Sequence, residues 1–421
     1  MGSRHVLIAG GGIGGLSAAL ALALQGFDAT VLEKAPEFIE IGAGLQLAPN
    51  ATRVLNRLGV LADVLDVGVL PSRIVLASAM TGEELSFLDV RDFGARYGGP
   101  YVLAHRGDLL DVLYHACHAS PSVELRPSKA VVSVTQPGPG VVVAHCADGT
   151  EVSGDALIGA DGLHSVVRRL IADSEPAFSG YVAYRGAVPV SEVEAQSDSR
   201  DVVVFIGPEL HFVQYPLRRG ELYNQVAVFR SHRYQAGEPE WGGPDELDSR
   251  FSVTCEQIRI ALKAIQRDMH WPMYDREPLG NWRHGRAVLL GDAAHPMLQY
   301  FAQGACQALE DSECLASSLA AAAGAGRDIT DGFGDYQRLR IPPTARVQRN
   351  ARLWGDLWHA DGLLRLLRDA FLRERDPADH RHVAWLYQDE PSGAPGAGAA
   401  DGQAPAARTI PAASAAVTTP S

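Results

Sequence analysis

The sequence is poor in cysteine and in long apolar runs. Five of its 421 residues are cysteines, and no two of them form a C-x-x-C pair. Such scattered thiols are typical of a reduced protein and argue against a disulfide-stapled secreted domain. The longest apolar helical stretch, around residues 315–323, is far shorter than the roughly 20 residues that cross a bilayer, and residues 1–5 do not resemble a signal peptide. We therefore expect a cytoplasmic protein without a membrane span.

Runs of positive charge are also absent. The chain has 50 acidic and 37 basic residues, a net charge of -13, and no run of five or more Lys or Arg. A surface with this excess of negative charge repels phosphates, so we expect a small-molecule partner and no nucleic acid. There is no G-x-S-x-G, no P-loop and no zinc-ligand spacing. The His380 and His382 pair in a polar stretch is more typical of a surface than of a metal site, so no metal is expected.

A dinucleotide-binding unit opens the chain. The apolar run 5–9 predicts a buried strand, 13–25 a helix and 29–32 a second strand, and the glycines of Gly10-x-Gly12-x-x-Gly15 lie between the first strand and the helix. Glycines there make the tight turn and let the backbone approach a pyrophosphate, while an acid after the second strand accepts hydrogen bonds from a ribose diol. That acid disfavours NADP, leaving FAD or NAD. The expected nucleotide contacts are Gly10, Gly12, Ile13, Gly14, Gly15, Glu33 and Lys34.

The middle of the chain predicts a second sheet. Further apolar strands are expected at 131–134, 141–145, 156–158, 202–206, 211–215, 225–229 and 287–290. Several alternate or pair as hairpins, so this sheet should be mostly antiparallel. Residues 391–421 hold no aromatic residue and almost no large aliphatic one, which predicts a disordered tail.

Two further motifs carry a family resemblance. The segment 159–168 (GADGLHSVVR) resembles the G-A-D-G-x-x-S-x-V-R segment of the single-component (class A) FAD-dependent aromatic hydroxylases, and 286–296 (RAVLLGDAAHP) resembles their G-D-A-A-H segment. The resemblance covers about residues 4–390. It implies an α/β fold like that of p-hydroxybenzoate hydroxylase: a Rossmann-type FAD-binding domain (1–75, 101–180 and 278–345), an inserted, mostly antiparallel β substrate domain (76–100 and 181–277) and a C-terminal helical segment (346–390).

The same resemblance implies how the cofactors bind. FAD is the bound cofactor, and NADH, or alternatively NADPH, binds transiently because no second nucleotide fold is present. Where the family commonly has Asn, this chain has Cys306, which leaves the role of that position open. Members are often homodimers. The further FAD contacts implied are Gly44, Leu45, Arg106, Val131, Asp161, Asp292, Gly304 and Ala305.

The family's chemistry needs an electron-rich ring. Its flavin C4a-hydroperoxide, formed with O2, is a mild electrophile, so the substrate is typically a phenol that must be hydrogen-bonded or deprotonated in a dry site. His211 and Tyr215 are four apart in one predicted strand and thus share a face; the pattern alone equally suits an ordinary half-buried strand. Segments 180–186, 205–217, 271–278 and 354–359 resemble the branch that hydroxylates 3-hydroxybenzoate.

In that branch the residues matching His211, Gln299, Tyr215 and Tyr101 line the substrate site. The resulting hypothesis is oxidation of 3-hydroxybenzoate to 2,5-dihydroxybenzoate (gentisate): His211 is the base or the hydrogen-bond acceptor for the phenol, Gln299 orients the phenol oxygen, and Tyr215 and Tyr101 position the ring and carboxylate. The alternatives are a salicylate-type decarboxylating hydroxylase of the same fold and a flavin-binding protein without oxygenation. An anionic benzoate would also need a locally neutral or positive entrance on this acidic protein.

Overall fold

The parallel sheet of the nucleotide-binding part follows the strand order β17-β18-β11-β1-β2-β7. The computed structural model describes residues 4–39, 43–193, 200–234 and 241–388; the tail predicted for 391–421 lies outside them. Neighbouring strands are parallel except β17 and β18. The strands are β1 (His5–Ala9), β2 (Asp28–Leu32), β7 (Val123–Arg126), β11 (Ala156–Gly159), β17 (Arg283–His284) and β18 (Ala287–Leu289).

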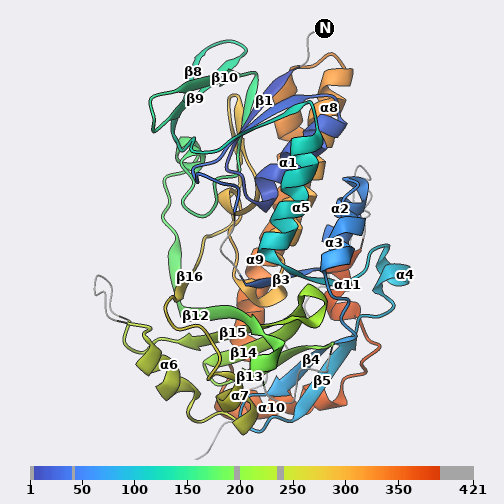
Figure 1. Ribbon diagram of the computed structural model, residues 1–421, viewed down its shortest axis with the longest axis vertical. Helices are drawn as coiled ribbons and strands as arrows, with labels where there is room; N and C mark the ends of the chain where they lie inside the picture. The colour runs from blue at the N-terminus through green and yellow to red at the C-terminus, as the bar shows by residue number, and fades with distance from the viewer. Residues whose placement is uncertain (1–3, 40–42, 194–199, 235–240, 389–421) are drawn as a thin grey trace, which may run out of the picture. The chain divides into compact units, whose positions relative to one another are not determined.

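Three helices pack on this sheet side by side: α1 (Ile13–Leu24), α5 (Arg106–Ala119) and α8 (Gly304–Gly324) (Figure 1). Nearly every residue of α1 up to Leu22 is buried, because its small and aliphatic side chains are enclosed by both neighbours. A small antiparallel sheet of β8 (Val131–Gly138), β9 (Val141–Cys146) and β10 (Glu151–Gly154) adjoins this part of the molecule. The predicted Rossmann-type unit is confirmed.

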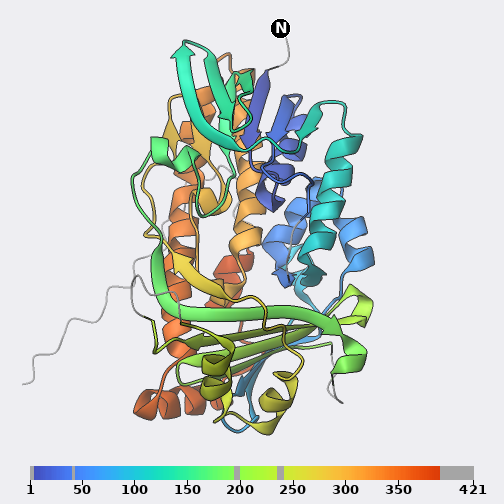
Figure 2. The same cartoon turned by 60° about the vertical axis from the view of Figure 1, so that its left-hand side comes forward.

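The second large sheet has the order β16-β12-β15-β14-β13-β4-β5, and all its pairs are antiparallel except β13 with β4. Figure 2 shows β12 as a long curved strand running across it. One side packs on α6 (Pro244–Phe251) and α7 (Glu256–Ala261) through an aromatic and aliphatic core. The strands are β4 (Arg73–Ser78), β5 (Glu84–Asp89), β12 (Ala177–Pro189), β13 (Val202–Gly207), β14 (Leu210–Leu217), β15 (Leu222–Arg230) and β16 (Trp271–Asp275).

The long helix α9 (Ile329–Trp358) joins the two parts. It packs along α8, and at its C-terminal end the His359 carbonyl accepts a hydrogen bond from the Glu209 amide at 3.1 Å. It remains one helix although it contains Pro342 and Pro343. The remaining elements are α2 (Pro49–Arg57), α3 (Leu61–Val67), α4 (Phe93–Tyr97), α10 (Gly362–Glu374), α11 (Arg381–Tyr387) and the paired strands β3 (Gly44–Leu47) and β6 (Val102–His105).

The predicted fold class, an α/β protein with an antiparallel substrate sheet and a helical C-terminal segment, is thus confirmed. The residue ranges given to each domain stay predictions. Within the described part of the chain, no helix combines the length and apolarity that a bilayer span demands. The same residues contain no cluster of three or more His, Cys, Asp or Glu side chains suited to a metal ion.

Candidate active site

A cavity of about 1220 Å³ lies between the nucleotide-binding part and the second sheet. It is lined from β3, β12, β14, the start of α8 and the end of α9, and by His211, Tyr215, Gln299, Tyr101 and Arg106. A drug-sized ligand typically occupies a pocket of roughly 300–1000 Å³. The volume is therefore larger than one benzoate needs and leaves space for a second ring system.

The glycine turn at the end of β1 has the geometry that the sequence predicts. Gly10 has φ +103°, and a Cβ there would lie 2.4 Å from the Ala160 carbonyl oxygen; at Gly15 a Cβ would lie 1.9 Å from the Gly10 oxygen. Gly12, by contrast, has open space on its Cβ side, and it precedes α1 without a side-chain cap. The turn therefore leaves room and free amides for a phosphate.

Glu33 follows β2 beside this turn. Its carboxylate accepts hydrogen bonds from the amides of Gly11 at 2.6 Å and Ala35 at 2.8 Å. These bonds hold it at the mouth of the turn, where its remaining lone pairs can receive ribose hydroxyls. Lys34 beside it is exposed.

The opposite edge of the nucleotide site is formed around Asp292. Its side chain is exposed and lines the cavity, although Gly291 and Ala293 on either side are buried. Gly304 and Ala305 line the same cavity at the start of α8, which also begins without a side-chain cap. A free carboxylate and the N-terminus of a long helix suit the hydroxyls and the electron-rich ring of a flavin. The residues present therefore fit FAD.

The other predicted cofactor residues have mixed placements. Gly44 and Leu45 of β3 and Arg106 at the start of α5 line the cavity. Asp161 is turned inward: its carboxylate accepts hydrogen bonds from the Ser165 hydroxyl at 2.5 Å and the Val166 amide at 2.7 Å, so it holds its own loop. Val131 is half-buried at the start of β8, where it pairs with Cys146 of β9.

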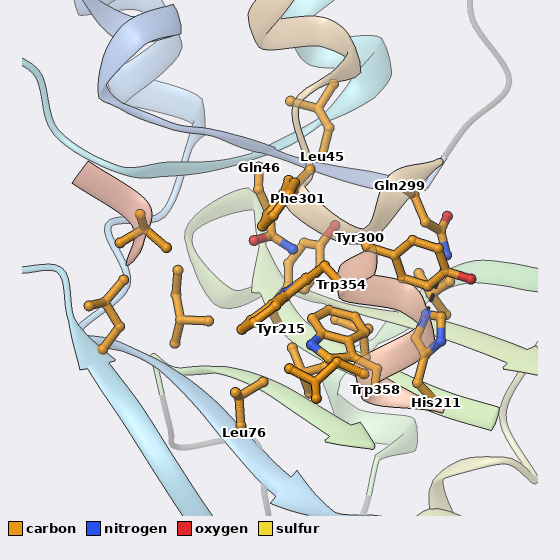
Figure 3. Close-up of a pocket in the computed structure, with 18 of the residues that line it drawn as sticks. Leu45, Gln46, Leu76, His211, Tyr215, Gln299, Tyr300, Phe301, Trp354 and Trp358 are labelled. Atoms are coloured by element: carbon orange, nitrogen blue, oxygen red, sulfur yellow. Dashed lines mark hydrogen bonds between the residues drawn. The ribbon is translucent and has the colours of Figure 1, made fainter. Parts of the chain in front are cut away.

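His211 of β14 lies at the substrate end of the cavity, with 1% of its surface exposed. Its Nε2 is 3.4 Å from Nε2 of Gln299, and its Nδ1 is 2.8 Å from Nε2 of His359. Burial, the neighbouring His359 and the charge of Arg185 lower the pKa of His211 well below its usual range. The imidazole is therefore neutral, and its unprotonated nitrogen can accept a hydrogen bond from a substrate hydroxyl. Figure 3 shows Gln299 and His211 on the same side of the pocket.

Two buried tyrosines face the same cavity from different elements. Tyr215 of β14 and Tyr101, which precedes β6, are 3% and 4% exposed. The Tyr101 hydroxyl donates a hydrogen bond to Oε1 of Gln46 at 2.7 Å. Burial raises the pKa of both phenols, and in Tyr215 a hydrogen bond with Gln46 only partly offsets this. Both tyrosines stay protonated at neutral pH.

Comparisons with known proteins show which family the chain belongs to. Residues 3–351 match the FAD binding domain family. The 3-hydroxybenzoate 6-hydroxylase 1 of Aquipseudomonas alcaligenes is 39% identical over 394 residues, covering 92% of this chain and 98% of the relative. The 3-amino-4-hydroxybenzoate 2-monooxygenase of Streptomyces cremeus is 37% identical, with 91% and 94% covered. The chain belongs to the family of FAD-dependent aromatic hydroxylases.

Solved structures of other proteins share the fold of this hydroxylase. Klebsiella pneumoniae HpxO complexed with FAD and uric acid superposes with a TM-score of 0.80 at 25% identity, covering 93% of this chain and 98% of that one. A salicylate hydroxylase substrate complex superposes with a TM-score of 0.75 at 25% identity, covering 92% and 96%. FAD is therefore the cofactor of the hydroxylase.

Three residues near the substrate end were not predicted as site residues: Arg185, His359 and Gln46. Arg185 of β12 donates a hydrogen bond from Nη2 to Oε1 of Gln299, and its Nε is buried without a hydrogen-bond partner. The alternation of β12 places Arg185 and Tyr181 on one face, and the Tyr181 ring stacks on His359 at 4.4 Å between ring centroids. That alternation is the sequence signal that could have found Arg185.

Cys306 has a local structural role. Its thiol donates to the carbonyl oxygens of Gln46 and Ala302, both at 3.6 Å, and burial raises its pKa to about 12. A thiol this weakly acidic is not a nucleophile at neutral pH. Cys306 thus fastens β3 to the start of α8 beside the cavity.

Proposed function

We propose that the hydroxylase converts 3-hydroxybenzoate to 2,5-dihydroxybenzoate, with NADH and O2 as co-substrates. The observation that carries the proposal is a neutral, buried imidazole, His211, beside an amide, Gln299, inside a cavity of net positive lining. Bound FAD supplies the activated oxygen after reduction by NADH and reaction with O2. The protein must then bind the phenol, orient it and keep water away.

His211 is the proposed base. Its Nε2 faces the cavity beside Gln299, so a substrate hydroxyl placed there can donate to the imidazole and accept from the amide. Withdrawing that proton makes the ring more electron-rich and directs attack to the positions ortho and para to the oxygen. We assign the para position by similarity to the 39% identical 3-hydroxybenzoate 6-hydroxylase 1, because position 6 is para to the 3-hydroxyl.

The carboxylate is the part of the substrate that the protonated tyrosines can recognise. Tyr215 and Tyr101 both retain their hydroxyl protons, because burial raises their pKa values. A phenolic hydroxyl is a good donor to a carboxylate in a dry site. We assign both residues to positioning the benzoate carboxylate and ring: Tyr215 can donate to the carboxylate while it accepts from Gln46, whereas Tyr101 donates to Gln46 and can donate to the carboxylate only if the carboxylate replaces that acceptor.

The lining of the cavity suits an anion although the protein as a whole is acidic. Five arginines line it against two aspartates, Asp292 and Asp379. The formal net charge of the whole chain is -13. Arg368 and Arg381 pair with Asp369 and Asp379, whereas Arg185 lies beside Gln299 with Arg106 as a neighbour, so a benzoate would meet positive charge from Arg185 and Arg106. Aromatic side chains on the same wall, among them Phe301, Trp354 and Trp358, supply apolar surface that excludes water (Figure 3).

The cofactor contacts follow the placements described above. We propose that Gly10, Gly12, Ile13, Gly14 and Gly15 surround the pyrophosphate and that Glu33 and Lys34 face the ribose side. Asp292 would bind the hydroxyls of the ribitol chain, while Gly304 and Ala305 would present amides to the flavin ring. Gly44, Leu45 and Arg106 would flank that ring, Val131 would contact the adenine through its backbone, and Asp161 would hold the loop near the pyrophosphate.

A substrate panel tests the proposal. Purified FAD-loaded enzyme with NADH should consume oxygen and form 2,5-dihydroxybenzoate from 3-hydroxybenzoate, with close to one product per NADH. Salicylate, 3-amino-4-hydroxybenzoate and NADPH are the comparison arms, and carbon dioxide release would identify a decarboxylating reaction instead. Oxygen consumption without 2,5-dihydroxybenzoate would reject the substrate, and no substrate-stimulated NADH oxidation would reject a hydroxylating function.

His211→Asn tests the assigned base. Asn keeps a polar side chain but cannot accept the phenol proton as a base, so hydroxylation should fall by roughly 10²-fold or more. More of the NADH consumed should then end as hydrogen peroxide. Unchanged coupling of NADH to product would remove His211 from this role.

We further propose that the hydroxylase is a cytoplasmic homodimer. The helix α10 supports a dimer because Leu363, Leu364, Leu366, Leu367 and Phe371 are each more than half exposed. Five large apolar side chains on one helix are unusual for a monomer surface. Light scattering should give about twice the 45.0 kDa chain mass, and Leu366→Glu should shift the enzyme toward the monomer.

A further inference from the structure

Two buried side chains, His211 and His359, and two partly buried ones, Arg185 and Gln299, form one hydrogen-bonded row beside the cavity. Arg185 of β12 donates from Nη2 to Oε1 of Gln299 in the 3₁₀ helix η5 (Gln299–Phe301). Nε2 of Gln299 is 3.4 Å from Nε2 of His211, and Nδ1 of His211 is 2.8 Å from Nε2 of His359, which follows α9. The base proposed above is therefore held on both sides.

Arg185 determines which atom donates and which accepts in each hydrogen bond of the row. A guanidinium has only donors, so Gln299 must turn its oxygen toward Arg185 and its NH2 group toward His211. An NH2 group is also only a donor, so Nε2 of His211 must accept. In a neutral imidazole the proton then lies on Nδ1, which donates to Nε2 of His359.

The second imidazole completes this assignment. Burial and the charge of Arg368 lower the pKa of His359 to about 3, so it is neutral and its Nε2 can accept. The ring is also fixed in place, because it stacks on Tyr181 on one side and on His211 with centroids 5.1 Å apart. Every bond in the row thus has one consistent donor and one acceptor.

We propose that Arg185 and His359 are positioning residues that hold His211 in its Nδ1–H tautomer, so that Nε2 carries a lone pair and can accept the substrate proton when the phenol hydroxyl replaces the Gln299 amide as its partner. The opposite tautomer would present an N–H to the cavity and could not act as the base. The inference concerns the resting enzyme, so the tautomer does not depend on which phenol is hydroxylated. Its kinetic consequence rests on the proposed function.

The tautomer can be measured directly by NMR. Full-length, FAD-loaded enzyme labelled with ¹⁵N-histidine gives long-range ¹H–¹⁵N correlations whose pattern distinguishes Nδ1–H from Nε2–H, and His211→Asn identifies the signals of His211. The wild-type enzyme should show Nδ1–H. His359→Phe keeps an aromatic ring but removes the acceptor, which should shift the tautomer ratio by a factor of roughly 5 to 150 toward Nε2–H. The ratio shifts because, in this variant, the Nδ1–H tautomer of His211 would leave a buried N–H donor without an acceptor.

Conservative variants separate positioning from a merely structural role. His359→Gln restores an acceptor and should restore the Nδ1–H pattern. Arg185→Leu should weaken the tautomer preference in the same direction as His359→Phe, whereas Arg185→Lys, which keeps a cationic donor, should preserve it. Tyr181→Phe is the matched control, because it keeps the ring that stacks on His359 and removes only the hydroxyl. It should leave the spectrum unchanged.

Kinetics provide the second readout. If His359→Phe acts through the tautomer, kcat for hydroxylation should fall about tenfold or more. KM and FAD content should stay near those of the wild type. His359→Gln should recover most of the lost kcat. Wild-type His211 in the Nε2–H or the doubly protonated form would overturn the inference. So would an unchanged His211 tautomer in a folded His359→Phe enzyme. A wrong substrate assignment would alter only the kinetics.

Discussion

The buried ion pair between Asp311 of α8 and Arg340 of α9 gives a quantitative stability prediction. Asp311 is fully buried and accepts hydrogen bonds from Arg340 Nε at 2.7 Å, from His295 Nε2 at 2.5 Å and from the Gly291 amide at 3.1 Å. Burial alone would raise the pKa of Asp311, but His295 and Arg340 outweigh it and lower that pKa to about 2. The carboxylate is therefore charged at neutral pH.

Asp311→Ala leaves the Arg340 guanidinium with Glu310, at 3.4 Å, as its one carboxylate partner among the residues that the structure describes. Removing one member of a buried pair typically costs about 3–5 kcal/mol, a large share of the roughly 5–15 kcal/mol that stabilises a folded domain. Urea unfolding of the enzyme, followed by tryptophan fluorescence, measures this cost. Trp282 reports on the region because its ring centroid is 5.2 Å from that of His295.

The control is on α9, the helix that also carries Arg340. Arg338 makes an exposed ion pair with Asp335 at 3.2 Å, so Arg338→Ala should cost no more than about 1 kcal/mol. The double variant Asp311→Leu with Arg340→Met removes both buried charges and should cost clearly less than the sum of the two single changes. The reasoning is refuted if Asp311→Ala costs no more than Arg338→Ala, or if the two single costs simply add.

Two further predictions concern the substrate end. A Cβ at position 44 would lie 2.6 Å from the ring of the buried Tyr215. Gly44→Ala should therefore displace that ring and raise KM for the aromatic substrate roughly 10- to 100-fold in steady-state assays. Gly94→Ala is the control, because a Cβ at position 94 meets open space and should leave KM unchanged. His211 and His359 have lowered pKa values in the folded state, so the unfolded chain binds more protons below pH about 6.5. The free energy of unfolding should then fall with falling pH by about 1.4 kcal/mol per unit for each histidine; an unchanged slope in His359→Gln would contradict this.

The nucleotide-binding unit could be predicted from the sequence because its constraints are local. The strand predicted at 5–9 is β1, and the helix predicted at 13–25 is α1 to within one residue. Gly10 needs a positive φ, and Gly15 needs the absence of a Cβ against a neighbouring carbonyl. Each of these requirements depends on residues within one short segment, so the residue types reveal them.

The substrate sheet was predicted less completely, since part of it depends on contacts that are distant in sequence. The strands at 202–206, 211–215 and 225–229 were expected and are present as β13, β14 and β15. The parallel pairing of β13 with β4 joins residues more than 120 positions apart, so no local sequence pattern predicts it. The long helix α9 likewise passes through two prolines, which normally end a helix.

The candidate site shows the same difference between local features and contacts that are distant in sequence. His211 and Tyr215 could be proposed together because they share one strand, and both line the cavity. His359 could not be proposed, since its contact with His211 spans 148 positions and depends on where α9 ends. Pairings of this kind become visible only once the helix and the sheet have been placed against each other.

The acidity of the chain and the anionic substrate proposed for it are reconciled by where folding places the charges. Burial and the neighbouring Arg106 lower the pKa of Arg185. A buried guanidinium without a carboxylate beside it is costly. An anionic substrate would offset this cost, so the proposed function predicts that Arg185 contributes to its affinity. The net charge of -13 therefore says little about the site, because the cavity is lined by five arginines and two aspartates.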